Sequence, residues 1–427
     1  MSIRSRRSAT AFALSLSTLA ILVATLYPIG TALPLGWTFY IATGDQAVAE
    51  VIQNLLLFMP FGASLKIAGI RPGHAIATGS ALSFTVEFLQ QWIPGRDPSL
   101  GDIVCNTVGT ALGVLLVVSA PIWLWAPPRR SALQALAAAA LAVLVWIGTG
   151  VALQPIFPPP PLREVGAPDL SSWDHYPGKI LGVTYALGVL RVEAVAPSVP
   201  PNRTAPLAAI VNPQSTNAVI LAVAGSDLEL RYHMPAVRLR LVQPPLRWRG
   251  ALAAVAPGDT FTAATGHEGG TICMLVNHEW RCGLGYTIGD GWKLIFYPEH
   301  WPDWQLGVIN TLWIAGCVIG VGFWAARGTG DSREWLAMGV VIAGLLMVPL
   351  ITGLKPTPIY EWVGALGGMG VGWWLQRMEH LRSVAPGAVP RLTPGRCPGV
   401  KVLGLSAKPA PRAAGYTAHL SHLAPTN

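Results

Sequence analysis

Eight apolar segments, each close to the length needed to cross a lipid bilayer, constrain this chain more than any other feature. A helix rises about 1.5 Å per residue, so about 20 residues cross the hydrocarbon core. Charged residues make up only 12% of the chain, against roughly 25% in soluble proteins. The sequence therefore predicts a polytopic α-helical membrane protein. The predicted spans are 9–26, 51–69, 75–92, 103–125, 132–153, 306–325, 335–351 and 359–375.

The first apolar run follows a basic start, as in a signal peptide, but it is long for one and no small-residue cleavage site follows closely. We therefore expect an uncleaved first helix. With eight spans both termini lie on one side, and most Lys and Arg residues of the short loops lie on that side too. Because such residues favour the cytoplasm, the sequence predicts cytoplasmic termini for a protein of the plasma membrane. The net charge of +8 then reflects topology and a basic tail, and no nucleic-acid binding is expected.

The region between the fifth and sixth spans has a different sequence pattern, because the long apolar runs stop there. Alternating segments at 228–232, 237–241 and 293–297 are typical of short antiparallel strands. We expect an inserted extracytoplasmic all-β sandwich domain; the alternative is a loosely folded loop. The predicted organisation is a cytoplasmic tail at 1–8, a five-helix membrane domain at 9–153, the β-sandwich at 154–304, a three-helix membrane region at 305–376 and a basic, disordered cytoplasmic tail at 377–427.

A disulfide is predicted within this domain. A two-residue turn at Asn277 and His278 would place Cys273 opposite Cys282 in a non-hydrogen-bonded pair, where side chains come closest. The expected compartment is oxidising. The other cysteines, Cys105, Cys317 and Cys397, are expected to be reduced or inert, and no Cys or His array indicates a metal or another cofactor.

Polar residues inside the apolar segments are the candidate functional residues. Ionisable groups in hydrocarbon cost several kcal/mol, roughly 2.5 to 3.5, so they face a protein interior or a cavity. By topology they gather near the outer leaflet, and Gly109 and Gly113 would let the fourth span approach its neighbours. The candidate ligand-binding residues are Asn54, Glu87, Gln90, Arg96, Asp102 and Asn106; Glu87 and Asp102 are also the candidate catalytic pair.

Residues 10–125 resemble the VanZ-like family of bacterial membrane proteins. The resemblance is carried by NLLLFMPFG at 54–62, EFLQ at 87–90, PGR at 94–96 and DIVCNTVGTALG at 102–113. It implies a helical envelope protein associated, in the namesake, with resistance to lipophilic glycopeptide antibiotics. The family's polar positions carry over onto the six candidate residues. This chain departs from a minimal member in its β-domain and three further spans, which puts a simple resistance role in doubt.

Two weaker signals remain. The strands near 227–231 and the cysteine hairpin are similar to concanavalin A-like or laminin G-like sandwiches, a fold that often binds glycans. Asn310 follows Asn54 by 256 residues (310 − 54), and Glu361 follows Asn106 by 255 (361 − 106). Spans six to eight are thus either a degenerate copy of spans two to four or a chance match among Gly-rich segments.

The sequence leads to one function and leaves alternatives open. We expect a VanZ-like envelope protein that binds or moves an amphiphilic or glycan-bearing molecule at the outer leaflet, with membrane lipids as partners. A membrane-embedded hydrolase or transferase could instead use Glu87 and Asp102 as acid and base on a lipid-linked sugar. The chain could also be a membrane-anchored glycan-binding module. In a purely structural reading, the polar residues only join helices.

Overall fold

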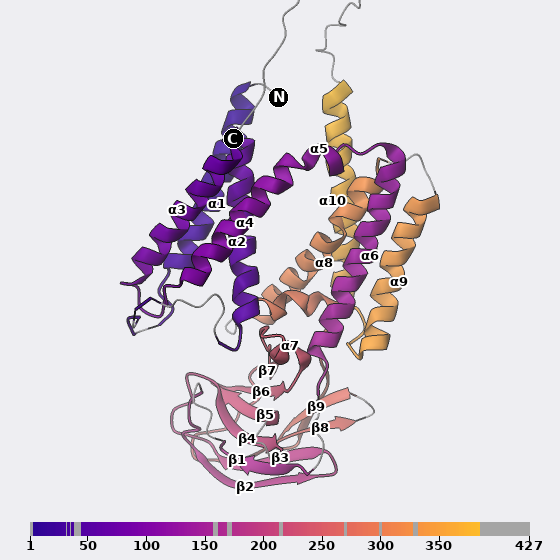
Figure 1. Ribbon diagram of the computed structural model, residues 1–427. Helices are drawn as coiled ribbons and strands as arrows, with labels where there is room; N and C mark the ends of the chain where they lie inside the picture. The colour runs from indigo at the N-terminus through magenta and orange to yellow at the C-terminus, as the bar shows by residue number, and fades with distance from the viewer. Residues whose placement is uncertain are drawn as a thin grey trace, which may run out of the picture. The chain divides into compact units, whose positions relative to one another are not determined.

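The computed structural model describes residues 3–30, 32–34, 36–37, 44–156, 161–168, 173–212, 217–268, 271–298, 301–327 and 332–384. Residues Met1–His380 form one compact unit. Within it the chain forms two groups of long helices and two β-sheets (Figure 1).

The first helical group, the first bundle, consists of α1 (Ile3–Leu26), α2 (Ala47–Ile67), α3 (Pro72–Gln90) and α4 (Leu100–Val118). Helix α1 packs on α2 and α3, and α4 packs on the same two helices. Ile21, Phe58, Val86 and Val114 are buried in its core. A short helix, α5 (Ala120–Trp123), follows.

The second helical group, the second bundle, consists of α6 (Pro128–Leu153), α8 (Asp303–Ala325), α9 (Ser332–Thr352) and α10 (Ile359–Val384). Helix α6 packs on α8 and α9, as α1 packs on α2 and α3. Trp146, Ile314, Val341 and Ala365 lie in its core.

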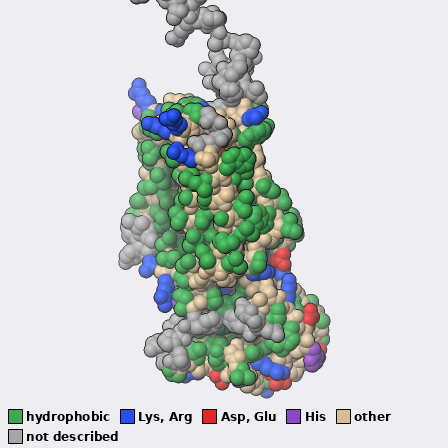
Figure 2. Space-filling view, turned by 90° about the vertical axis from the view of Figure 1, so that its right-hand side faces the viewer, with side chains coloured by type: hydrophobic (Ala, Val, Ile, Leu, Met, Phe, Trp, Pro, Cys, Tyr) green, Lys and Arg blue, Asp and Glu red, His purple; other side chains and the backbone are tan. Residues whose placement is uncertain are grey.

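Helices occur at all eight predicted places. Six of them, α1, α2, α4, α6, α8 and α9, are long and apolar enough to cross a membrane, among the residues that the structure describes. The crossing of α3 and α10 stays a prediction, and so does the number of spans. Helix α10 continues to Val384, and the rest of the predicted tail, 385–427, lies outside the described residues. Figure 2 shows a broad band of hydrophobic side chains over the helices, with Lys and Arg beyond it.

Glycines let α4 approach α2 closely. A Cβ added to Gly109 would lie 2.6 Å from the carbonyl oxygen of Leu55, and one added to Gly113 would lie within 3.0 Å of the carbonyl oxygen of Met59. Real Cβ atoms essentially never come so near, so only glycine permits this helix spacing.

The same contacts recur between α10 and α8. A Cβ on Gly364 would overlap the carbonyl oxygen of Thr311, and one on Gly368 would overlap that of Ala315. These glycines lie 255 residues (364 − 109 and 368 − 113), and these carbonyls 256 residues (311 − 55 and 315 − 59), after their counterparts in the first bundle. Two pairs of contacts in matching register, together with the parallel packing of α1 and α6, favour a repeat over a chance match.

The region between α6 and α8 forms two five-stranded antiparallel sheets, ordered β1-β4-β5-β6-β7 and β10-β9-β8-β3-β2. Both contribute to one hydrophobic core that includes Leu207, Leu221, Phe261 and Met274, so the β-domain is confirmed. The strands are β1 (Arg163–Gly166), β2 (Lys179–Ala186), β3 (Val189–Val195), β4 (Ala205–Val211), β5 (Asn217–Ala224), β6 (Asp227–Tyr232), β7 (Leu246–Trp248), β8 (Thr260–Glu268), β9 (Thr271–Val276) and β10 (Glu279–Leu284).

The predicted hairpin has the expected register. Val276 pairs with Glu279 and Met274 with Arg281, while Asn277 adopts the positive φ of 53° that a tight hairpin turn needs. Cys273 and Cys282 are disulfide-bonded, with their Cα atoms 4.0 Å apart. Cys105 and Cys317 are free, and Cys397 lies outside the described residues.

Two of the three predicted strands are wrong. Residues 228–232 lie in β6, as expected. In contrast, 237–241 begins inside a helical turn, α7 (Pro235–Arg238), because Pro235 at the first helical position fixes φ there. Residues 293–297 overlap the end of a 3-10 helix, η1 (Ile288–Leu294), which a capping box of Thr287 and Asp290 initiates.

Candidate functional site

The predicted site residues lie at the end of the first bundle where α2 and α4 begin and α3 ends. Nδ2 of Asn54 donates a hydrogen bond of 2.7 Å to Oδ1 of Asp102, which joins the second turn of α2 to the first turn of α4. Both side chains are half-buried.

Glu87, on α3, is almost completely buried, with 2% of its surface exposed. Its Oε2 accepts a hydrogen bond of 3.0 Å from the backbone N–H of Ser99. Ser99 is the N-cap of α4, and its side chain accepts from the N–H of Gly101. Glu87 therefore holds the loop that leads into α4.

Gln90 and Arg96 act on a different element, the carboxyl end of α1. Gln90 Nε2 donates to the carbonyl oxygen of Thr25 at 3.0 Å. Arg96 donates from Nε to the carbonyl of Tyr27 at 3.0 Å and from Nη2 to that of Ala24 at 2.6 Å. The last carbonyls of a helix have no partners within it, and a cation stabilises the negative end of the helix dipole. These two residues thus cap α1.

Asn106 lies one turn deeper in α4. Its Nδ2 donates to Oγ of Ser83 on α3 at 3.0 Å, while its Oδ1 is buried without a hydrogen-bond partner among the described residues. Further in, the hydroxyls of Ser80 and Thr107 lie 3.0 Å apart. Polar side chains therefore continue along the interface of α3 and α4 towards the middle of the helices.

Several charged groups gather at this end of the bundle. Asp102 is close enough to Glu87 and to Glu50 for their charges to repel one another, and Arg96 is close enough to Glu87 for their charges to attract. Among the described residues, the other oxygens of Glu87 and Asp102 accept no hydrogen bond. No group of three His, Cys, Asp or Glu side chains in the described part of the chain has the arrangement of a metal site. The cluster can thus accept hydrogen bonds from, or exchange protons with, a group that enters it.

The matching positions of the second bundle carry another polar cluster. Asn310, the counterpart of Asn54, donates from Nδ2 to Oδ1 of Asp290 at 2.9 Å and accepts from Nε1 of Trp292 at 2.7 Å. Glu361, the counterpart of Asn106, is fully buried and accepts from the hydroxyl of Thr287. The helix η1 is thus fixed on α8 and α10 by the residues that the repeat identifies.

Sequence reasoning identified Asn310 and Glu361 through the repeat but not their partners on η1. The signal was present: Thr287 and Asp290 have the spacing of a helix-capping box. Lys293, one turn on, lies 2.6 Å from Oδ1 of Asp290.

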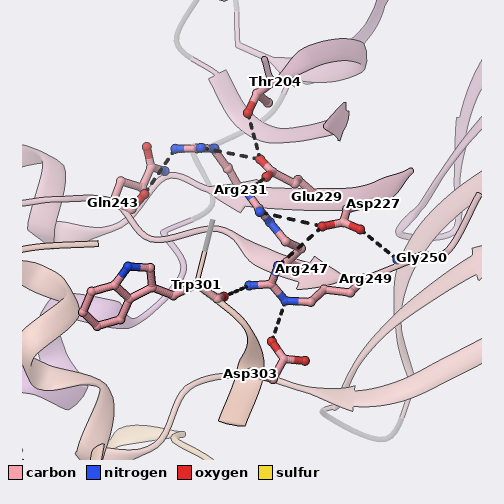
Figure 3. A network of polar contacts seen from close by, with 10 residues as sticks. All are labelled: Thr204, Asp227, Glu229, Arg231, Gln243, Arg247, Arg249, Gly250, Trp301 and Asp303. Carbon is pink, nitrogen blue, oxygen red and sulfur yellow. Dashed lines mark hydrogen bonds and ion pairs between the residues drawn. The ribbon is translucent and has the colours of Figure 1, made fainter. Parts of the chain in front are cut away.

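A second network missed by the sequence connects the β-domain to α8 (Figure 3). Glu229, which is fully buried, accepts from Thr204 Oγ1 at 3.1 Å and pairs with Arg231 and Arg247. Arg249 pairs with Asp303, the first residue of α8, at 2.7 Å. Asp227, Glu229 and Arg231 lie at every second position of β6, and Arg247 lies on the neighbouring edge strand β7. The network therefore fixes the edge of one sheet to a membrane helix.

Fold and site together define a helical membrane protein with an inserted β-domain and a buried polar cluster at one end of its first bundle. Residues 6–124 match the family model of VanZ/LLP1. The match covers the first bundle, so the resemblance seen in the sequence is confirmed for this part of the chain. No curated protein and no solved structure matches the chain. The likeness of the β-domain to concanavalin A-like or laminin G-like sandwiches therefore stays a prediction.

Proposed function

We propose that this chain is a VanZ-like envelope protein that binds, or moves, an amphiphilic or glycan-bearing molecule at the outer leaflet. The cluster of Asn54, Glu87 and Asp102 would receive the polar head of that molecule. The supporting observation is the burial of the Glu87 carboxylate among apolar helices. Its single hydrogen-bond donor, among the described residues, is the backbone N–H of Ser99. A buried carboxylate with a free oxygen favours a ligand that offers N–H or O–H donors.

The remaining candidate residues have supporting roles in this proposal. Gln90 and Arg96 fix the end of α1 beside the cluster. Asn106 offers a buried, unoccupied acceptor one turn below it. A head rich in hydroxyl or amine groups, as in an amino sugar or a glycan, fits acceptors of this kind, while its apolar tail would lie in lipid.

Orientation is part of the proposal. The β-domain and the polar cluster lie outside, and the termini lie in the cytoplasm, because the loops between α2 and α3 and between α8 and α9 and the first turn of α6 carry basic residues. The molecule would then enter from the outer leaflet, where lipophilic glycopeptide antibiotics and lipid-linked sugars meet the membrane. A link to glycopeptide tolerance follows from the family match.

The test is Glu87→Gln in the full-length chain, produced in a strain that lacks the native gene. This change preserves the shape and the contact with Ser99 but removes the charge. If the carboxylate meets a ligand, glycopeptide tolerance or another envelope phenotype is lost while the protein accumulates normally in the membrane. Asp102→Asn should behave alike. Glu164→Gln, on an exposed strand position of the β-domain, is the matched control and should be silent. If Glu87→Gln retains wild-type tolerance, the proposal is refuted and the polar residues only join helices.

An enzyme is the second candidate, because Glu87 and Asp102 interact electrostatically. Two coupled carboxylates can divide the roles of acid and base. Turnover of a lipid-linked sugar by the purified wild-type protein, abolished by Glu87→Gln, would support it. Binding without turnover would support the first candidate.

A further inference from the structure

A cavity of 690 Å³ lies beside η1 at the second bundle, away from the residues of the proposed site. Thr287, Asp290 and Lys293 of η1 line it, together with the first two turns of α8 and with Lys355 and Tyr360 before and at the start of α10. Its volume is within the range of small-molecule sites, about 300 to 1,000 Å³.

The acidic groups of this cavity already have partners. Asp290 accepts from the N–H of Thr287 at 2.7 Å and from Asn310 at 2.9 Å, and it pairs with Lys293. Asp303 pairs with Arg249. Neither carboxylate therefore presents an uncompensated negative charge to the cavity.

The cavity retains positive charge and donors. Lys355 takes part in no ion pair among the described residues. An ammonium group has three N–H donors. The contact of Lys293 with Asp290 uses one of its three. Tyr360 also lines the space. The surplus of donors and one uncompensated cation favour an anionic ligand.

The position of Lys355 is built into the fold. Its backbone N–H donates to the carbonyl of Tyr286 at 2.8 Å. Its side chain lies against Gly285, where an added Cβ would come within 3.1 Å of the lysine Cγ. A glycine at this place makes room for the lysine stem, and both Gly285 and Lys355 line the cavity.

One side of the cavity continues onto the lipid-exposed face of α8. Trp304 is 68% exposed and Val308 is 48% exposed, and both line the cavity. Leu312, one turn further, is exposed on the same face. Aromatic residues favour the interface of a membrane with water, so the cavity is placed at headgroup depth with an apolar helix surface beside it.

We propose that this cavity binds the phosphate group of an anionic amphiphile, with Lys355 and Lys293 as its donors and with its chain along α8. The proposal uses none of the residues of the first-bundle site. A result that refutes binding at this cavity would therefore not refute the proposed function of the first bundle.

The test is lipid binding by the full-length protein, purified in a neutral detergent and titrated with phosphatidylglycerol in native mass spectrometry. Charged hydrogen bonds contribute roughly 1.5 to 3 kcal/mol, so Lys355→Gln should weaken the tightest phosphatidylglycerol binding by about tenfold or more. Lys355→Arg keeps the charge and should retain most of the affinity. Lys179→Gln, on an exposed strand position of the β-domain, is the matched control and should bind as the wild type does.

Two further measurements distinguish a lipid headgroup from free phosphate as the ligand. Competition by millimolar inorganic phosphate would support a site for the phosphate group itself, and resistance to it with retained phosphatidylglycerol binding would assign the site to the lipid. Phosphatidylcholine carries no net charge and should bind more weakly. Equal binding of the two lipids, an unchanged affinity in Lys355→Gln, or an equal loss in Lys179→Gln would each overturn the proposal.

Discussion

Nδ2 of Asn310 donates a hydrogen bond of 2.9 Å to Oδ1 of Asp290, and this contact joins a membrane helix to the last element before it. Asn54 makes the corresponding contact in the first bundle, where its partner is Asp102. In both bundles an asparagine near the start of the helix binds an aspartate. The first aspartate belongs to a neighbouring helix, whereas the second comes from η1, which follows the β-domain.

Substitution of Asn310 should loosen η1. In Asn310→Leu the volume is similar, but Nε1 of Trp292 loses its acceptor in a buried place, and Oδ1 of Asp290 keeps only its contact with Lys293. An unsatisfied buried polar group costs about 1 to 3 kcal/mol. We expect a lower midpoint of thermal unfolding in detergent and faster proteolysis between β10 and α8. Asn202→Leu, at an exposed loop position, is the control. An unchanged midpoint and proteolysis rate for Asn310→Leu would contradict this role.

The ion pair of Asp290 and Lys293 predicts how stability depends on pH. Burial alone raises the pKa of the Asp290 carboxyl, but the Lys293 charge and the hydrogen bonds outweigh it and hold the pKa below its ordinary value. Burial alone lowers the pKa of the Lys293 ammonium, but Asp290 outweighs it and raises the pKa. The stabilisation is therefore fully present between about pH 4 and about pH 10.4, the ordinary values of the two groups. It is lost as the pH falls through the lowered pKa or rises through the raised one.

Thermal unfolding measured across this pH range checks the prediction. In Lys293→Gln the alkaline loss should shrink and the acid loss should begin at a higher pH, because Asp290 then lacks its cation. Lys179→Gln should leave the profile unchanged. A pH profile of Lys293→Gln that matches the wild type would show that the pair does not contribute.

The sequence predicted what depends on local pattern. The apolar runs indicated the helices, and the parity of the hairpin from Cys273 to Cys282 indicated the disulfide. The strands expected at 237–241 and 293–297 failed because alternation alone does not reveal a Pro start or a capping box, which favour helical turns.

The candidate site was predicted only in part, for a physical reason. The sequence predicted that Asn54, Glu87 and Asp102 lie at one depth, and in the structure they lie at the same end of the first bundle. It could not indicate that Arg96 would face the carbonyls of α1, because side-chain direction in a loop depends on tertiary contacts. Thr287, the partner of Glu361, lies 74 residues earlier in the chain, so no local pattern around Glu361 indicates the contact.

Topology can be tested by labelling single cysteines in intact cells. A cysteine at Asp259, an exposed position of the β-domain, should react with an impermeant maleimide. One at Arg129, exposed at the start of α6, should react only after permeabilisation, because the basic loops favour the cytoplasm. Labelling of both in permeabilised cells controls for accessibility. The reverse pattern would overturn the orientation.

The repeat makes a prediction about paired glycines. A Cβ at Gly368 would meet the carbonyl oxygen of Ala315 within 3.0 Å, while one at the adjacent Gly367 would meet nothing within 4 Å. Gly368→Ala should therefore push α10 from α8 and lower the midpoint of thermal unfolding. Gly367→Ala should be neutral or slightly stabilising, because alanine is favoured over glycine in helices by about 1 kcal/mol.

The first bundle offers the parallel experiment. Gly113→Ala should destabilise as Gly368→Ala does, because its Cβ would meet the carbonyl oxygen of Met59. Gly73→Ala, at an open position near the start of α3, should be silent. If the two bundles are copies with the same helix spacing, Gly113 and Gly368 will respond alike and their controls will not. A destabilisation by Gly367→Ala equal to that by Gly368→Ala would show that the loss does not come from the close contact of Gly368 with Ala315, and the structural basis for the repeat would then be lost.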